Sequence, residues 1–292
     1  MTVIRLIASD MDGTLLNERM TVPPENAAAI QAAAEKGIQF IVASGRSYTE
    51  AKPLMEQVGI KTPMITMNGA EVFDENGEII STVTIRKQVA RKIFHILREQ
   101  GIYFEIMTMN GTCSDSKMKR IQNVASLLVD LKTTDSFKIA VSLASARLEL
   151  MAINYVSSYD VILDDPNEFI LKIIAFSPEN QALLAPVAEK LNALGNLAIT
   201  ASSASNLEIN HIDAQKGAAL ATYADKLGIP MSQVMAIGDN LNDRSMLEAA
   251  SVSFAMGNAT PEIKKVARYL TDTNINHGVG QAIERAIREN LS

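Results

Sequence analysis

The outer segments of the chain carry short apolar runs without polar alternation, and this pattern constrains the fold more than any other feature. The runs lie at 3–9, 38–44 and 233–238, and helical stretches at 24–37 and 214–228 stand between or beside them. A strand that is wet on one face alternates with a period of two, whereas a strand covered on both faces is apolar throughout. Because helices separate these runs, we expect a doubly wound α/β fold built on a parallel sheet.

The middle of the chain differs from the outer segments and predicts a second, inserted domain. An amphipathic helix is expected at 86–101 and another helix at 179–195. The strand-like runs of this region carry the polar interruptions of a sheet with one wet face, and they lie at 103–109, 137–144 and 169–177. A chain of 292 residues is long enough for two domains. We expect a doubly wound, Rossmann-like core from residues 1–84 and 201–292, with a second α/β domain inserted at residues 85–200.

The composition argues against several classes of partner. The formal net charge is −6 and the pI is about 5.2, so we expect no nucleic-acid-binding surface and no attraction to an anionic membrane. No uninterrupted apolar stretch approaches the ~20 residues that span a bilayer. The single cysteine, Cys113, excludes an intramolecular disulfide. We therefore expect a cytoplasmic protein that is a monomer or a weak homodimer.

Polar residues follow the outer strands at the point where each strand ends. In an open parallel sheet the ligand crevice lies just outside the carboxyl ends of the strands. Residues that are far apart in the sequence should therefore meet in one small volume. The residues expected there are Asp10, Ser44, Gly45, Arg46, Asn68, Asp239, Asn242 and Asp243.

The acidic members of this set predict a metal site. Asp10, Asp12, Asp239 and Asp243 would bring up to four negative charges together, and each like-charged pair at ~4 Å costs about 1 to 4 kcal/mol. A divalent cation removes that repulsion. Oxygen ligands favour Mg²⁺, and the three histidines show no zinc-binding spacing.

Two neighbouring carboxylates also allow phosphoryl chemistry. One can attack phosphorus to give an aspartyl-phosphate, while the other protonates the leaving alkoxide and then deprotonates water. Ser44 and the amides of Met11 and Gly45 can hold phosphate oxygens. Lys216, near the start of a helix, adds a positive charge for the phosphoryl group and for the acidic cluster.

Four segments together resemble the motifs of the haloacid-dehalogenase-like phosphatases. They are DMDGTLL (10–16), ASGR (43–46), Lys216 and GDNLNDRSML (238–247). Their order and spacing are similar to those of the Cof-type subgroup, in which a large α/β cap is inserted between the second and third motifs. Two further stretches, MNGA (67–70) and TNINHGV (273–279), resemble the same subgroup.

The resemblance implies a role for each residue of the expected site. Asp10 would be the nucleophile and a Mg²⁺ ligand, and Asp12 the acid/base and a ligand through its main-chain carbonyl. Asp239 would bind the metal, and Asp243 would bind it through water or support the other ligands. Phosphate would be bound by the amide of Met11 and by Ser44, Gly45, Lys216 and Asn242.

The expected function is Mg²⁺-dependent hydrolysis of a small phosphorylated metabolite, such as a sugar phosphate, a flavin phosphate or pyridoxal phosphate. Two alternatives remain open from the residues: a phosphomutase or phosphotransferase on the same site, and a non-catalytic phosphometabolite sensor. Arg46 is equally suited to a phosphate contact and to a structural ion pair, and His211 to a structural or a substrate-binding role. The sequence does not specify the substrate.

Overall fold

The computed structural model describes residues 4–130, 136–148, 153–178, 181–203 and 205–292. The chain divides into two compact units. Unit 1 comprises Met1–Val83 and Asp213–Ser292, and unit 2 comprises Thr84–Ile212. Unit 2 is thus inserted into the sequence of unit 1.

An eight-stranded sheet with the order β14-β13-β12-β1-β2-β3-β4-β5 forms the centre of unit 1. The first six strands in this order pair in parallel, and β4 and β5 add an antiparallel edge. The bounds are β1 (Leu6–Ser9), β2 (Gln39–Ala43), β3 (Met64–Thr66), β4 (Glu71–Phe73), β5 (Ile79–Thr82), β12 (Val234–Gly238), β13 (Val252–Ala255) and β14 (Tyr269–Leu270). The strands β1 and β12 are buried along their whole length, because both faces of the sheet are covered.

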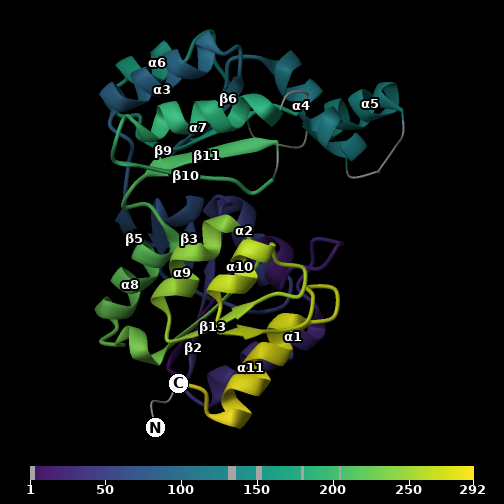
Figure 1. Ribbon diagram of the computed structural model, residues 1–292, viewed down its shortest axis with the longest axis vertical. Helices are drawn as coiled ribbons and strands as arrows, with labels where there is room; N and C mark the ends of the chain where they lie inside the picture. Colours follow the sequence, from purple (N-terminus) through teal and green to yellow (C-terminus); the bar gives the residue numbers. More distant parts are fainter. Residues whose placement is uncertain (1–3, 131–135, 149–152, 179–180, 204) are drawn as a thin grey trace. The chain divides into compact units, whose positions relative to one another are not determined.

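Helices cover both faces of this sheet. The helix α1 packs against α11 and α8 packs against α9, and the two pairs lie on opposite sides of the sheet (Figure 1). The helices are α1 (Pro24–Glu35), α2 (Tyr48–Glu56), α8 (Lys216–Lys226), α9 (Arg244–Ala249), α10 (Pro261–Val266) and α11 (Gly278–Glu289). Four short helical turns connect these elements. The turn η1 (Met11–Leu15) follows β1, and η2 (Met67–Gly69) follows β3. The turn η4 (Met231–Gln233) precedes β12, and η5 (Leu241–Asp243) lies between β12 and α9. The predicted doubly wound α/β fold with a parallel sheet is confirmed.

Unit 2 contains a six-stranded sheet with the order β10-β11-β9-β6-β7-β8. Its strands are β6 (Tyr103–Thr108), β7 (Gly111–Ser114), β8 (Ile153–Tyr155), β9 (Ile170–Phe176), β10 (Leu197–Thr200) and β11 (Asn206–His211). Figure 1 shows α3 (Lys87–Glu99), α6 (Asp160–Asp164) and α7 (Leu184–Asn192) on one side of this sheet. A turn of 3₁₀ helix, η3 (Gln181–Leu183), precedes α7. Apart from the parallel pair β7–β8, the neighbouring strands are antiparallel.

Two features of unit 2 differ from the expectations. The run 137–144, predicted as a strand, lies in a helix, α5 (Phe137–Leu148), which packs on α4 (Lys117–Asp130). Ala140 and Ala144 recur at helical spacing and are fully buried in a small cluster between the two helices. The strand β11 pairs with β9 and β10, so unit 2 extends to Ile212, whereas the expected insertion ended at residue 200.

Within the described residues, no helix is both long enough and apolar enough to cross a membrane.

Candidate functional site

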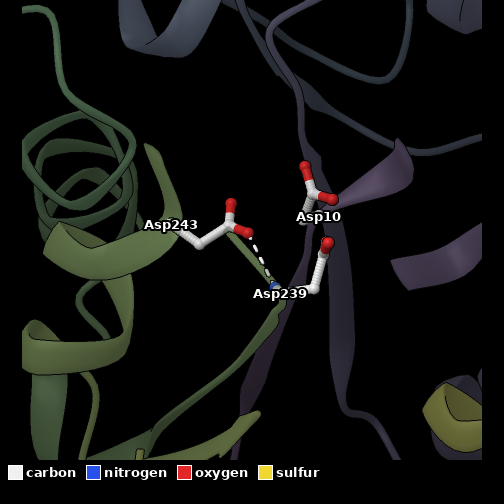
Figure 2. Close-up of side chains that lie close together, drawn as sticks. All are labelled: Asp10, Asp239 and Asp243. Carbon is white, nitrogen blue, oxygen red and sulfur yellow. Dashed lines mark hydrogen bonds between the residues drawn. The ribbon is translucent and has the colours of Figure 1, made fainter. Parts of the chain in front are cut away.

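Three carboxylates meet at the carboxyl ends of two neighbouring strands. Asp10 directly follows β1 and Asp239 directly follows β12, and these strands pair in parallel with Ser9 opposite Ile237. Asp243 lies in η5 of the same loop as Asp239. One carboxylate oxygen from each of the three residues lies within 4.8 Å of the others. Figure 2 shows the three side chains close together.

The loop after β12 is folded around the Asp243 carboxylate. Its Oδ2 accepts the main-chain N–H groups of Asp239 at 2.9 Å and Asn240 at 3.0 Å. A Cβ atom at Gly238 would stand 2.6 Å from the Cβ of Asp243, so only glycine allows this tight return of the chain. Asp243 therefore shapes the loop that presents Asp239, besides offering an oxygen to the cluster.

The loop after β1 requires a glycine for a similar reason. Gly13 has a φ of +80°, and a Cβ atom at this position would lie 2.6 Å from Oδ2 of Asp239. The hydroxyl of Thr14 donates to Oδ1 of Asp239 at 2.7 Å. Thr14 is not among the residues expected from the sequence, although its place in the DGT segment beside the acidic pair is a signal for it.

Lys216 supplies the positive charge inside the cluster. Its Nζ lies 2.5 Å from Oδ1 of Asp10 and 2.6 Å from Oδ1 of Asp243, and the side chain is fully buried at the start of α8. Burial opposes the ammonium charge, but attraction by the two carboxylates dominates and raises the pKa of Lys216 above its ordinary value. Lys216 therefore stays charged.

One ammonium does not balance three carboxylates. Burial raises the pKa of Asp10 well above its ordinary value, and repulsion by Asp243 raises it further, against the opposing effect of Lys216. Burial, followed by repulsion from Asp243, raises the pKa of Asp239 to about 6. The three carboxylates thus carry more negative charge than the single ammonium of Lys216 can offset. Three carboxylate oxygens within 4.8 Å of one another form a donor set that fits a hard divalent cation.

Asp12 lies two residues from Asp10 but makes a different contact. Its carboxylate accepts two hydrogen bonds from Arg46, from Nε at 2.7 Å and Nη2 at 2.6 Å. The Asp12 side chain is 45% exposed, whereas Asp10 is buried. Two roles were left open for Arg46, a phosphate contact and a structural ion pair, and in the structure Arg46 forms the ion pair with Asp12.

The remaining expected residues follow several strands: Ser44 and Gly45 come after β2, Met11 after β1 and Asn242 after β12. The buried Ser44 accepts the N–H of Arg46 through its hydroxyl at 3.1 Å, and its carbonyl accepts the N–H of Asn68 at 3.0 Å. The amide of Asn242 donates to Oδ1 of Asn68 at 3.2 Å, which ties the loop after β12 to the loop after β3. Gly45 lies between Ser44 and Arg46, and Met11 is fully buried in the loop after β1. His211 ends β11 in unit 2.

The chain matches the haloacid dehalogenase-like hydrolase family over residues 7–283. It is 32% identical over 287 residues to "Phosphatase YwpJ" of Bacillus subtilis, covering 97% of this chain and 100% of that protein. It is 32% identical over 280 residues to the B. subtilis "5-amino-6-(5-phospho-D-ribitylamino)uracil phosphatase YcsE", covering 96% and 94%. A solved haloacid dehalogenase-like hydrolase from B. subtilis aligns with a TM-score of 0.85 at 31% identity, covering 96% of this chain and 99% of that one.

Proposed function

The chain belongs to the haloacid dehalogenase-like hydrolase family, and from this premise we propose that it is a Mg²⁺-dependent phosphatase acting on a small phosphorylated metabolite. The observation that carries the proposal is the buried cluster of Asp10, Asp239 and Asp243 around Lys216. Such a cluster, with more carboxylates than ammonium groups, is costly to bury unless it also binds a cation.

Asp10 is the proposed nucleophile. An oxygen of its carboxylate forms a bond to phosphorus while the bond from phosphorus to the ester oxygen breaks, which leaves an aspartyl-phosphate and an alkoxide. Lys216 already contacts Asp10 and would orient that carboxylate while its charge offsets that of the phosphoryl group. Met11 (through its amide), Ser44, Gly45 and Asn242 would hold the phosphate oxygens.

Asp12 is the proposed acid and base. In its protonated form it would give a proton to the departing alkoxide, and the carboxylate so formed would later take one from the water that attacks the aspartyl-phosphate. The sum of both steps is an ester and water converted into an alcohol and inorganic phosphate. Arg46 holds the Asp12 carboxylate through two hydrogen bonds and so fixes its direction.

The metal would be held by Asp10, Asp239 and the main-chain carbonyl of Asp12, with Asp243 as a direct or water-mediated ligand. When bound, Mg²⁺ would neutralise the negative charge that the carboxylates and the phosphoryl group share. We assign Mg²⁺ because the donor set consists of oxygen atoms only.

We propose a sugar phosphate or a related phosphomonoester as the substrate, since a relative of 32% identity is named for a phosphorylated ribityl compound. Unit 2 is proposed to be the inserted cap domain that recognises the leaving group.

The test is release of inorganic phosphate from p-nitrophenyl phosphate and from a panel of phosphorylated metabolites, with and without Mg²⁺. We expect turnover that needs Mg²⁺ and that Asp10→Asn abolishes, while the fold persists by circular dichroism. Asp225→Asn is the matched control, because Asp225 is exposed on α8. Absence of turnover across the panel, or full activity of Asp10→Asn, would contradict the proposal. Transfer of the phosphoryl group to a second hydroxyl instead of water would identify a phosphotransferase.

A further inference from the structure

Three asparagine side chains hold the main chain of the loop that carries Asp12. The amide of Asn258 donates to the carbonyl of Gly13 at 2.8 Å, and that of Asn274 to the carbonyl of Leu16 at 2.9 Å. The amide of Asn26 donates to the carbonyl of Leu15 at 3.2 Å. These three asparagines lie in separate parts of the sequence, so it is the tertiary structure that places their amide donors at one loop.

Asn258 lies in a segment that contacts both acidic loops of the site. It lies in the segment between β13 and α10, and its Oδ1 accepts the main-chain N–H of Asn274 at 3.0 Å. Two residues further along, the N–H of Thr260 donates to the carbonyl of Asp239 at 3.1 Å. This short segment therefore contacts both acidic loops of the site, the one after β1 and the one after β12.

The carbonyl that Asn258 holds belongs to the peptide between Gly13 and Thr14. Gly13 has a φ of +80° and no Cβ to restrict it. The next residue, Thr14, bonds Asp239 through its hydroxyl, and the preceding residue is Asp12. Rotation of the peptide between Gly13 and Thr14 would therefore displace Asp12, the proposed acid/base, together with Thr14, which contacts the proposed metal ligand Asp239.

We infer that Asn258 is a positioning residue for the phosphatase reaction: its amide fixes the Gly13 carbonyl and thereby the directions of Asp12 and Thr14. The inference rests on the proposed function for its kinetic consequence, but not for the structural one. Asn258 itself is exposed, so water can replace its amide when it is removed. Its loss should cost little stability and yet leave the Gly13 carbonyl without the donor that fixes its direction.

The first test compares Asn258→Ala with the wild type using p-nitrophenyl phosphate. We expect kcat to fall about 10- to 100-fold, the scale of a small misplacement of reacting groups, while KM and the inhibition constant of inorganic phosphate change less than about threefold, since the proposed phosphate ligands remain. Asn258→Asp should lose as much, because it keeps the oxygen that accepts from Asn274 but has no amide donor.

The matched control is Asn154→Ala. Asn154 is also exposed, and its amide donates to a main-chain carbonyl, that of Asn110, at 3.1 Å in unit 2. A similar fall in kcat for this control, or an unchanged kcat for Asn258→Ala, would overturn the inference.

The second test is independent of turnover. Amide hydrogen exchange should be faster at residues 11–16 in Asn258→Ala than in the wild type, with no change in β1 or β12, and Asn154→Ala should not show this. Unchanged exchange at residues 11–16 would overturn the inference even if the wild type proved to have no phosphatase activity. Lack of wild-type turnover with faster exchange would contradict the proposed function and leave the role in loop orientation supported.

Discussion

The guanidinium group of Arg46 holds both carboxylate oxygens of Asp12, at 2.7 Å and 2.6 Å. The pair joins the loop after β2 to the loop after β1, so the direction of the proposed acid/base depends on a neighbouring strand. The planar fork of arginine matches the carboxylate in a way that the point charge of lysine does not.

Arg46→Lys tests that dependence. We expect kcat to fall about tenfold or more with a small change in KM, because a single ammonium leaves the Asp12 carboxylate free to rotate. Steady-state kinetics with p-nitrophenyl phosphate measure this. Arg91→Lys, which changes an exposed ion pair with Asp164, is the control and should be unaffected. Equal loss in both variants would argue against an orienting role for Arg46.

Asp12→Asn should discriminate between leaving groups. A p-nitrophenolate leaves without a proton, whereas a sugar alkoxide needs one, so the loss in the first step should be much larger for a sugar phosphate than for p-nitrophenyl phosphate. The ratio of kcat/KM values for the two substrates, compared with the wild-type ratio, measures the effect. An unchanged ratio would contradict the acid role.

Gly13→Ala should abolish activity for a steric reason. The substitution is strained by the φ of +80°, and its methyl group would collide with Asp239. Gly37→Ala is a close control, since φ is +77° there and nothing lies within 4 Å of the added carbon. Both variants should lose about 1–2 kcal/mol of unfolding free energy from the left-handed backbone, but only Gly13→Ala should lose Mg²⁺-dependent turnover. Activity in Gly13→Ala close to that of Gly37→Ala would show that the contact with Asp239 is dispensable.

Lys216→Met should weaken both the fold and phosphate binding. It leaves the buried Asp10 and Asp243 without their shared cation, and removal of one member of a buried ion pair costs about 3–5 kcal/mol. Urea unfolding gives the free energy, and inhibition by phosphate gives the affinity. Mg²⁺ should recover part of the lost stability, because it neutralises the same carboxylates. The exposed Lys226→Met on the same helix is the control, and equal phosphate affinity in the two variants would contradict the assignment.

Glu71→Gln should raise stability near pH 7. Glu71 is buried in β4, and burial raises its pKa above the ordinary value. The folded state therefore holds this proton over a pH range in which the unfolded chain has lost it, and the free energy of unfolding falls as pH rises through that range. The variant should be more stable than the wild type above this range and no different below about pH 4. Thermal unfolding at several pH values measures the difference, with the exposed Glu75→Gln as control; a pH-independent difference would contradict the cause given.

The sequence predicted the class of the core because burial on both faces of a strand leaves a local pattern. The runs that became β1, β2 and β12 are apolar without alternation, and this holds whatever their neighbours are. The polar residues that directly follow these strands were predicted to meet for a topological reason, since the carboxyl ends of parallel strands lie at one edge of the sheet. The structure brings Asp10 and Asp239 together in that way.

Local pattern could not predict features that depend on partners distant in the sequence. The run 137–144 has strand-like composition, yet it forms a helix whose Ala140 and Ala144 are buried against α4. The ion pair of Arg46 with Asp12 and the amide of Asn258 on Gly13 each join segments separated by many residues, and only the order of strands decides them. Residue types and local periodicity thus determined which groups are available, whereas tertiary structure decided which of them touch, because strand pairing and side-chain contacts are set by the whole packed chain.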